Sequence, residues 1–426
     1  SAKITAALAD APNFGAQPLT IGHLETLAPG VGEADTITTG IDRDIVFGGT
    51  GADSIVANFG ETVTVADADN IVLGDDGFID FTLTDTDPAD IDIISSSDFT
   101  DGGADTITTG KGNDLILGGQ ANDGITAGNG TNIVIGDSGI ITGAMENTNR
   151  FSTIPMSMGR IETTAFGVGG ADTITTGDGN DIVLGGDKGD TIGASQGDNI
   201  VLGDDGALDY VRQERDGVTP GADLSAADID YIVSLSTTAA GGADHITMGA
   251  GNDLVIGGRN ADTITVGAGH NLVIGASGNL TAANEDANRF GSLALTVGRI
   301  ETITYDDGGN DQITTLLGND VIFGGNAADT INAGEGDNLV LGDEGAIDYV
   351  AVERGATAGV QGADTNAGDI DLITSLSTTA NGGVDGVTTG AGNDLVIGGR
   401  YGDTVGAGEG NNLVIGDSGQ ITAAND

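Results

Sequence analysis

A nine-residue spacing of turn residues is the feature that most constrains what this chain can fold into. In the clearest stretch these residues are Asp105, Asp114, Asp123 and Asn132, and each is followed by three residues whose middle member is Ile or Val. We interpret each unit as a turn rich in Gly, Asn and Asp, which tolerates positive φ, and a short strand with its central aliphatic side chain on one face. Two units make one coil, and coils stack. The pattern predicts an all-β fold, a parallel β-solenoid.

Two longer sequence repeats run through the whole chain. A start similar to Ala-Asp-Thr-Ile-Thr recurs in six modules, whose spacing alternates between two lengths. Two modules make a unit of about 139 residues, because the segment that begins at Ser138 recurs at Ser277. We assign these larger units to residues 1–137, 138–276 and 277–417, and residues 418–426 begin a fourth. We expect one continuous solenoid.

Two kinds of connector alternate between the repeat blocks. One occupies 278–307 and has a counterpart at 139–168, and its alternating end around residues 295–301 predicts a strand. The other occupies 206–240 and predicts strands around 208–211 and 229–235 across a polar loop. We interpret both as longer coils of the same stack that carry side loops; separate hairpins that interrupt the solenoid are the alternative. Three coils per module would give about 18 coils and a length of roughly 85 Å.

Composition limits the partners. With 76 Gly and no Trp in 426 residues, the chain has little with which to fill a thick core. A net charge of −52 excludes binding to a nucleic-acid backbone and favours cations instead. There is no Cys for disulfides or thiolate metal sites, and no apolar segment is long enough for membrane insertion.

The turn aspartates are the candidate metal ligands. Because two units make a coil, aspartates 18 residues apart should stack about 4.8 Å apart on one edge. Carboxylate and glycine carbonyl oxygens in that number suit Ca²⁺, which takes six to eight oxygen ligands at roughly 2.3–2.6 Å, whereas Mg²⁺ would demand stricter octahedral geometry. On one edge we expect the pairs Asp35 with Asp53, Asp105 with Asp123, Asp172 with Asp190, Asp244 with Asp262, Asp311 with Asp329, and Asp385 with Asp403. On the other edge the candidates are Asp44, Asp114, Asp181, Asp253, Asp320 and Asp394.

These residues resemble a known family. The segments GGADTITTGKGNDLILGG at 102–119, GGADTITTGDGNDIVLGG at 169–186 and GGADHITMGAGNDLVIGG at 241–258 are similar to the nonapeptide repeats of RTX proteins. The resemblance implies a right-handed parallel β-roll with Ca²⁺ between turns, type I secretion and folding outside the cell. The chain departs from the pattern where Ala holds the fourth position, at Ala104, Ala121, Ala171 and Ala261. The fourth turn of every module carries Asn, which should weaken or abolish sites there: Asn70, Asn132, Asn199, Asn271, Asn338 and Asn412.

The metal-free chain is predicted to be unfolded. Ordering nine residues costs on the order of 9–18 kcal/mol of backbone entropy, and burying one inward aliphatic residue returns only about 1.5–3 kcal/mol. Stacked carboxylates without cations would widen that gap. Circular dichroism in excess chelator checks this prediction, since a full β signal there would contradict it.

Alternate strands differ in their outward residues. One set is rich in Thr, and the other is apolar at all three positions, which predicts burial on both faces. We expect the connectors to cover the second set; packing by another copy is the alternative. The outward residues concerned are Ile45, Phe47, Leu115, Leu117, Ile182, Leu184, Leu254, Ile256, Val321, Phe323, Leu395 and Ile397.

The remaining polar residues that could form a functional site do not indicate an enzyme. His23, His245 and His270 are scattered, and the pairs Arg160–Glu162 and Arg299–Glu301 fit ion pairs better than a partner site. We expect a structural, secreted, cell-surface protein of the adhesin or matrix type, a shaft, filament or layer that binds calcium and self-associates through the apolar sheet or the connectors. The alternatives are the calcium-binding accessory roll of a secreted RTX enzyme or toxin, and an ice-binding module, for which a thermal-hysteresis assay should be negative.

Overall fold

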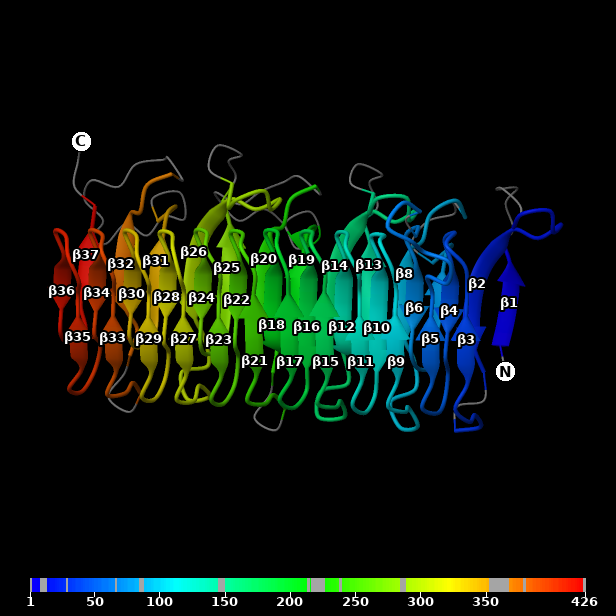
Figure 1. Ribbon diagram of the computed structural model, residues 1–426, viewed down its shortest axis with the longest axis horizontal. Coiled ribbons are helices and arrows are strands. Elements are labelled where there is room, and N and C mark those ends of the chain that lie inside the picture. The colour runs from blue at the N-terminus through cyan, green and yellow to red at the C-terminus, as the bar shows by residue number, and fades with distance from the viewer. Residues whose placement is uncertain are drawn as a thin grey trace.

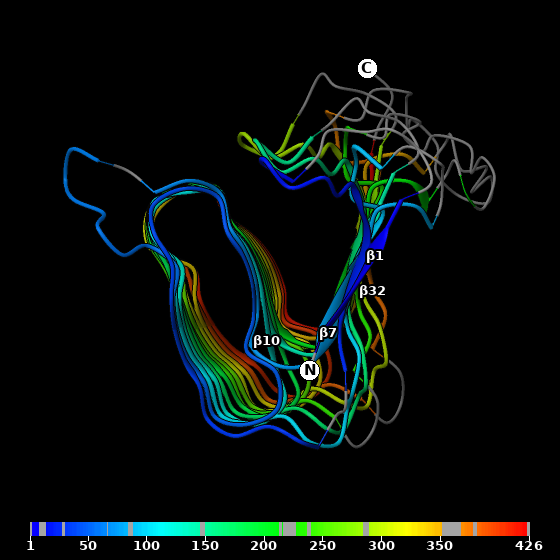
Figure 2. The ribbon, with the colours of Figure 1, turned by 90° about the vertical axis from the view of Figure 1, so that its right-hand side faces the viewer.

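The chain forms a linear stack of three β-sheets (Figure 1). The computed structural model describes residues 2–7, 14–27, 30–65, 67–83, 88–144, 150–212, 215, 227–236, 240–283, 289–351, 368–377 and 381–423. Seen along the stack, two sheets are the walls of a narrow coil and the third stands beside one of them (Figure 2). Within the described residues, no helix has the length and apolar character needed to cross a membrane.

The two walls of the coil are parallel sheets of 12 strands each, which confirms the parallel β-solenoid. Neighbouring strands pair in register, so that equivalent residues of successive coils lie side by side, as Ile107 does with Ile125. The threonine sheet contains β3 (Thr36–Thr38), β5 (Ser54–Val56), β9 (Thr106–Thr108), β11 (Gly124–Thr126), β15 (Thr173–Thr176), β17 (Thr191–Ala194), β21 (His245–Met248), β23 (Thr263–Thr265), β27 (Gln312–Thr314), β29 (Thr330–Asn332), β33 (Gly386–Thr388) and β35 (Thr404–Gly406). The central sheet contains β4 (Ile45–Phe47), β6 (Ile71–Leu73), β10 (Leu115–Gly119), β12 (Ile133–Asp137), β16 (Ile182–Gly186), β18 (Ile200–Asp204), β22 (Leu254–Ile256), β24 (Leu272–Ile274), β28 (Val321–Phe323), β30 (Leu339–Leu341), β34 (Leu395–Ile397) and β36 (Leu413–Ile415).

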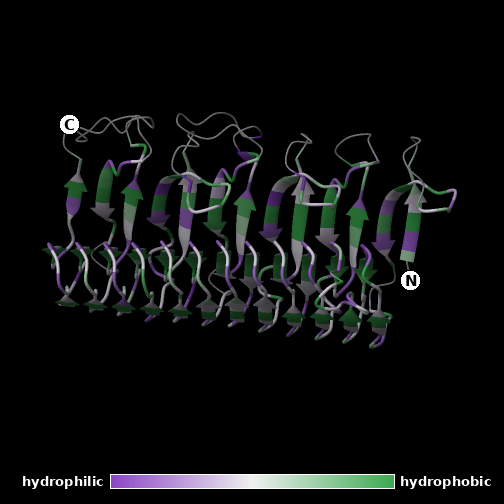
Figure 3. Ribbon diagram, turned by 45° about the horizontal axis from the view of Figure 1, so that its top comes forward, coloured by the Kyte–Doolittle hydropathy of each residue, from purple (hydrophilic) through white to green (hydrophobic). Residues whose placement is uncertain are grey.

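A thin core lies between these two sheets. It consists of the central residue of each strand, such as Ile107 and Ile125 from the threonine sheet and Ile116 and Val134 from the central sheet. In the colouring of Figure 3, hydrophobic residues follow the short strands of the two parallel sheets, whereas the strands of the third sheet carry hydrophilic bands as well. One aliphatic side chain per short strand is therefore what each nine-residue unit contributes to this core.

The turns need glycine because successive coils approach closely. Gly130 has φ of 147°, and a Cβ atom there would lie 1.7 Å from the carbonyl oxygen of Gly112 in the neighbouring coil. A side chain at that position would force the coils apart. The position two residues before the turn aspartate is less strict, since Ala121 adopts φ of 69° in the left-handed region, and the same position holds Lys188, Asn260, Ala327 and Tyr401. Ala104, Ala171 and Ala261 lie one residue further on, directly before the aspartate.

The connectors form the third sheet, which we call the hairpin sheet. Its 13 strands pair in antiparallel fashion, and each connector supplies two neighbouring strands. They are β1 (Ala2–Ala6), β2 (Ile21–Thr26), β7 (Gly77–Asp80), β8 (Ile93–Ser96), β13 (Gly139–Gly143), β14 (Met158–Thr163), β19 (Gly206–Asp209), β20 (Tyr231–Ser234), β25 (Gly278–Ala282), β26 (Val297–Thr302), β31 (Gly345–Asp348), β32 (Leu372–Ser375) and β37 (Gln420–Thr422). The predicted strands of both connectors are confirmed, and most of the polar side loop expected at 212–228 lies outside the described residues.

The interpretation of the connectors as longer coils is wrong. They leave the coil as hairpins, and the solenoid continues beneath them without interruption, because β11 pairs directly with β15 across the module border. Each module thus adds two coils and one two-stranded hairpin. Since strands are spaced about 4.8 Å apart in all three sheets, two hairpin strands cover two coils. The expected 18 coils become 12, and the stack is about 53 Å long rather than 85 Å.

The hairpin sheet covers the apolar outer face of the central sheet. Leu115 and Leu117 of β10 are buried in one cluster with Ile141 and Ile161 of the hairpin sheet. The same cluster contains Ile182, Leu184, Leu254, Ile256, Phe323 and Ile397, with Phe47, Val321 and Leu395 partly buried against it. Cover by the connectors is therefore confirmed, so the chain itself occupies this face, and self-association stays a prediction. At the end of the stack, Ile45 of β4 stays 37% exposed.

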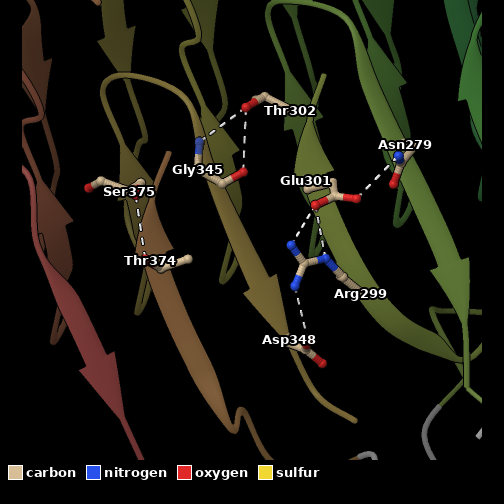
Figure 4. A network of polar contacts seen from close by, with 8 residues as sticks. All are labelled: Asn279, Arg299, Glu301, Thr302, Gly345, Asp348, Thr374 and Ser375. Atoms are coloured by element: carbon tan, nitrogen blue, oxygen red, sulfur yellow. Dashed lines mark hydrogen bonds and ion pairs between the residues drawn. The ribbon is translucent and has the colours of Figure 1, made fainter. Parts of the chain in front are cut away.

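Ion pairs on the hairpin sheet join neighbouring strands. The Arg299 guanidinium on β26 donates to Glu301 on the same strand, with Nε 3.0 Å from Oε2, and to Asp348 on β31, with Nη1 3.1 Å from Oδ2 (Figure 4). Arg160 makes the equivalent contacts with Glu162 and Asp209. The ion-pair interpretation of these Arg–Glu pairs is confirmed.

Candidate metal centres at the coil edges

Twelve aspartates form a continuous column where the chain passes from the central sheet or a hairpin to the threonine sheet. We call this the aspartate edge: Asp35, Asp53, Asp105, Asp123, Asp172, Asp190, Asp244, Asp262, Asp311, Asp329, Asp385 and Asp403. The backbone N–H of each donates to Oδ1 of the next, over 2.6–3.0 Å. The structure thus brings each predicted pair together and also links the pairs, as Asp53 to Asp105, so the edge is one uninterrupted column.

The second carboxylate oxygen of this column is buried without a partner. Within the described part of the chain, Oδ2 has no hydrogen-bond partner in Asp53, Asp105, Asp123, Asp172, Asp190, Asp244, Asp262, Asp311, Asp329, Asp385 and Asp403. A Cβ atom added to Gly118 would meet Asp123 Oδ2 at 2.6 Å and the carbonyl oxygen of Gly136 at 2.0 Å. Carboxylate and carbonyl oxygens therefore converge beside each glycine, which is the donor set that Ca²⁺ prefers. The residues present fit that ion.

Burial and mutual repulsion make this edge costly without cations. Burial, followed by the charges of Asp172 and Asp105, raises the pKa of Asp123 to about 10. Burial and the charges of Asp244 and Asp172 raise the pKa of Asp190 to about 11. A buried carboxylate whose neighbours are also carboxylates resists ionisation unless a positive charge is placed nearby. At neutral pH the edge therefore needs either protons or metal ions.

Four further aspartates, which sequence reasoning missed, hold the chain where hairpins begin. Asp137 ends β12, and its carboxylate accepts the backbone N–H of Gly170 at 2.8 Å and that of Asp187 at 2.5 Å. It thus ties the chain returning from the hairpin to the turn of the next coil. Asp75, Asp204 and Asp343 each accept two backbone N–H groups in the same way. The signal was available, because each follows a central-sheet strand as the Asp of a Gly-Asp pair.

One position in this series differs. Ala276 replaces the aspartate after β24. There the Asp307 carboxylate accepts from the Arg259 guanidinium at 3.0 Å and from the Ser277 hydroxyl at 2.9 Å. An ion pair therefore stands close to the site where the other hairpins use a carboxylate alone.

The opposite edge, where the chain passes from the threonine sheet to the central sheet, alternates Asp and Asn. We call it the mixed edge: Asp44, Asn70, Asp114, Asn132, Asp181, Asn199, Asp253, Asn271, Asp320, Asn338, Asp394 and Asn412. Each backbone N–H again donates to Oδ1 of the next residue, over 2.7–3.1 Å. Asn70 joins this column although an insertion precedes it, so the irregular first module is a longer loop that leaves the column intact.

Side chains alone do not complete a metal site. Among the described residues, no group of three or more His, Asp or Glu side chains is arranged to hold a metal ion. Any bound ion would therefore draw most of its ligands from the turn carbonyls. All 18 predicted aspartates lie in the two columns, and their role as ligands stays a prediction.

Comparison with known proteins identifies these turns. Six segments match the family described as the RTX calcium-binding nonapeptide repeat (4 copies), at residues 29–63, 99–139, 163–192, 248–279, 305–345 and 388–420. No curated protein matches the chain in a sequence search. The matched segments include the turns of both edges, and together they amount to about half of the 426 residues. The chain is therefore an RTX repeat protein that binds multiple calcium ions.

Proposed function

We propose that this chain is a structural, calcium-dependent extracellular repeat protein that serves as a rigid shaft, filament or surface layer of the adhesin or matrix type. The observation that carries the proposal is the unbroken stack: each strand of the two parallel sheets pairs with the next across every module border. A rod that continues in register through all six modules transmits load along its axis.

Five parallel lines of hydrogen bonds support the stiffness of this rod. Backbone ladders run through the two coil sheets and the hairpin sheet, and the side-chain oxygens of Asp or Asn accept backbone N–H groups along both edges. Bending the rod would break bonds on one side in several coils at once. Four coils make one 139-residue unit, so the axial repeat of an assembled fibre would be about 19 Å.

An extracellular location follows from the calcium requirement. The buried carboxylates of the aspartate edge need cations, and extracellular calcium modules work at about 10⁻⁴–10⁻³ M, far above cytosolic levels. We propose secretion by a type I system, with folding driven by calcium outside the cell. We also propose that this segment is not catalytic, in keeping with the separation of His23 on β2, His245 on β21 and His270 in a turn.

We propose that copies of this protein associate into a fibre through the connectors. The apolar face of the central sheet is already covered, so the hairpins and their loops are the connector surfaces that remain for a second copy. The net charge of −52 would oppose lateral contact, and calcium would reduce that repulsion.

Electron microscopy and fibre diffraction of the native material test this function. In saturating calcium we expect straight fibres or sheets with an axial repeat of about 19 Å, which dissolve when a chelator is added. Compact monomers in saturating calcium would contradict the structural role and favour the accessory roll of a secreted enzyme or toxin.

A further inference from the structure

The Asn side chains of the mixed edge already occupy oxygens that a cation would use. Asn132 Nδ2 donates to the carbonyl oxygens of Gly128 at 3.0 Å and Gly130 at 3.3 Å, and lies 2.9 Å from Oδ1 of Asp181 in the next coil. An amide nitrogen carries two hydrogens and can satisfy such acceptors without any metal. The turn carbonyls and the next carboxylate are therefore bridged by the protein itself.

The same arrangement recurs along the edge. Asn271 Nδ2 reaches Gly267 O at 3.3 Å, Gly269 O at 3.2 Å and Asp320 Oδ1 at 3.0 Å. Asn199 and Asn338 likewise donate to a turn carbonyl and to the carboxylate of the following coil. The amide contact is thus a regular feature of this edge.

One Asp turn of the mixed edge is closed by a threonine. Thr389 Oγ1 donates to Asp394 Oδ2 at 2.6 Å. Thr109 stands at the same place, five residues before Asp114, but in the described chain neither its hydroxyl nor Asp114 Oδ2 makes a hydrogen bond. Oδ2 is likewise buried without a partner in Asp44, Asp181, Asp253 and Asp320. Burial raises the pKa of Asp114 to about 7, although the nearby Thr109 hydroxyl opposes the rise. Thr39, Thr176 and Thr315 precede Asp44, Asp181 and Asp320 at this spacing.

The aspartate edge has neither the Asn amides nor these threonines. The residue five before Asp123 is Gly118, which has no hydroxyl, and glycine holds that place before Asp53, Asp190, Asp262, Asp329 and Asp403 as well. On the mixed edge the residue five before each Asn is apolar in the regular turns, Ala127 before Asn132 being an example. Threonine therefore accompanies Asp in five of the six mixed-edge turns, with Met248 before Asp253 the exception, and never accompanies Asn.

We propose that this protein holds its calcium on the aspartate edge, and that the chain's own Asn amides close the mixed edge by taking up its turn carbonyls and the next carboxylate. The inference rests on the proposed function, since it divides between the edges the calcium that this function requires. One ion per step between coils would give about 11 ions, whereas loading of both edges would give about twice that number.

Calcium stoichiometry of matched variants tests the division. Asp123→Asn and Asp114→Asn make the same change on opposite edges, and each protein is counted for bound calcium by equilibrium dialysis with atomic emission after folding is verified by circular dichroism. We expect Asp123→Asn to lose one or two ions and Asp114→Asn to lose none. Equal losses, or a wild-type count near 22, would overturn the inference while leaving the proposed function standing; no bound calcium at all would refute the proposed function.

Two further experiments keep the test decisive. If Asp123→Asn does not fold, Asp403→Asn and Asp394→Asn repeat the comparison in the last two coils, where any unfolding stays local because each coil contacts only its neighbours. The double variant Asn132→Asp with Ala127→Gly gives a mixed-edge turn the residues of an aspartate-edge turn. We expect it to bind one more ion than the wild type, and an unchanged count would overturn the inference.

Discussion

Removal of calcium followed by acidification tests the electrostatics of the aspartate edge. Burial raises the pKa of Asp172, Asp244 and Asp385 to about 7, from an ordinary value of 3.8. The folded metal-free state therefore keeps protons that the unfolded chain releases near pH 4. Because the folded state binds more protons in this range, its stability falls as the pH rises from about 4 towards the folded pKa values. The metal-free protein should gain structure on acidification, the reverse of ordinary acid unfolding.

The magnitude follows from the size of the shifts. One pKa unit corresponds to about 1.36 kcal/mol, so a carboxyl group with a folded pKa of about 7 weakens folding by about 2.7 kcal/mol between pH 5 and pH 7. Three such groups amount to about 8 kcal/mol, which is comparable with the whole stability of a typical domain. Calcium removes this penalty at neutral pH because it stabilises the ionised carboxylates.

The assay is a far-ultraviolet circular dichroism titration of calcium-depleted protein. Dialysis against a chelating resin removes the ion beforehand, so that no chelator is present whose strength varies with pH. We expect an unfolded spectrum at pH 8 and recovery of β signal towards pH 5, above the pI of about 4.1. Asp123→Asn, which removes one titrating group, should begin to recover at higher pH. A signal that is independent of pH, or stronger at pH 8, would refute the reasoning.

Three substitutions in calcium-saturated protein test the other contacts by urea denaturation. Ile141→Ala should lower the free energy of unfolding by about 2–5 kcal/mol because its side chain is buried between two sheets, and the half-buried neighbour Ile140→Ala should lower it by much less. Asp137→Ala leaves two buried N–H groups without acceptors and should cost about 2–5 kcal/mol, whereas the exposed turn residue Asp178→Ala should be nearly neutral. Arg299→Ala should cost about 1 kcal/mol or less, since its ion pairs are partly open to solvent. Equal effects within either matched pair would contradict the assigned contacts.

The nine-residue spacing was sufficient to predict the coil. A strand of three residues has one side chain that faces the core, and Ile107 and Ile116 show this alternation in the sequence itself. The turns were equally readable, because Gly and Asp occupy fixed places in every unit. The columns on both edges follow directly from that period, since equivalent residues must stack once the coils do.

The connectors could not be predicted in the same way. Alternation indicates a strand around residues 297–302 but does not say which strand will pair with it. The same alternation fits a longer coil, which pairs in parallel, and a hairpin, which pairs with its own neighbour. The Asp137 series was missed for a related reason, since its partners come from two different coils.

The sequence by itself therefore determined the repeating coil, its calcium-binding turns and the need to cover one apolar face. The tertiary structure alone decided what covers that face and which atoms the Asn side chains of the mixed edge contact. Both depend on contacts between residues far apart in the chain, such as Ile141 against the central sheet and Asn132 against Asp181. Local periodicity fixes which side chains point outward, and only the packed stack shows what each of them meets there.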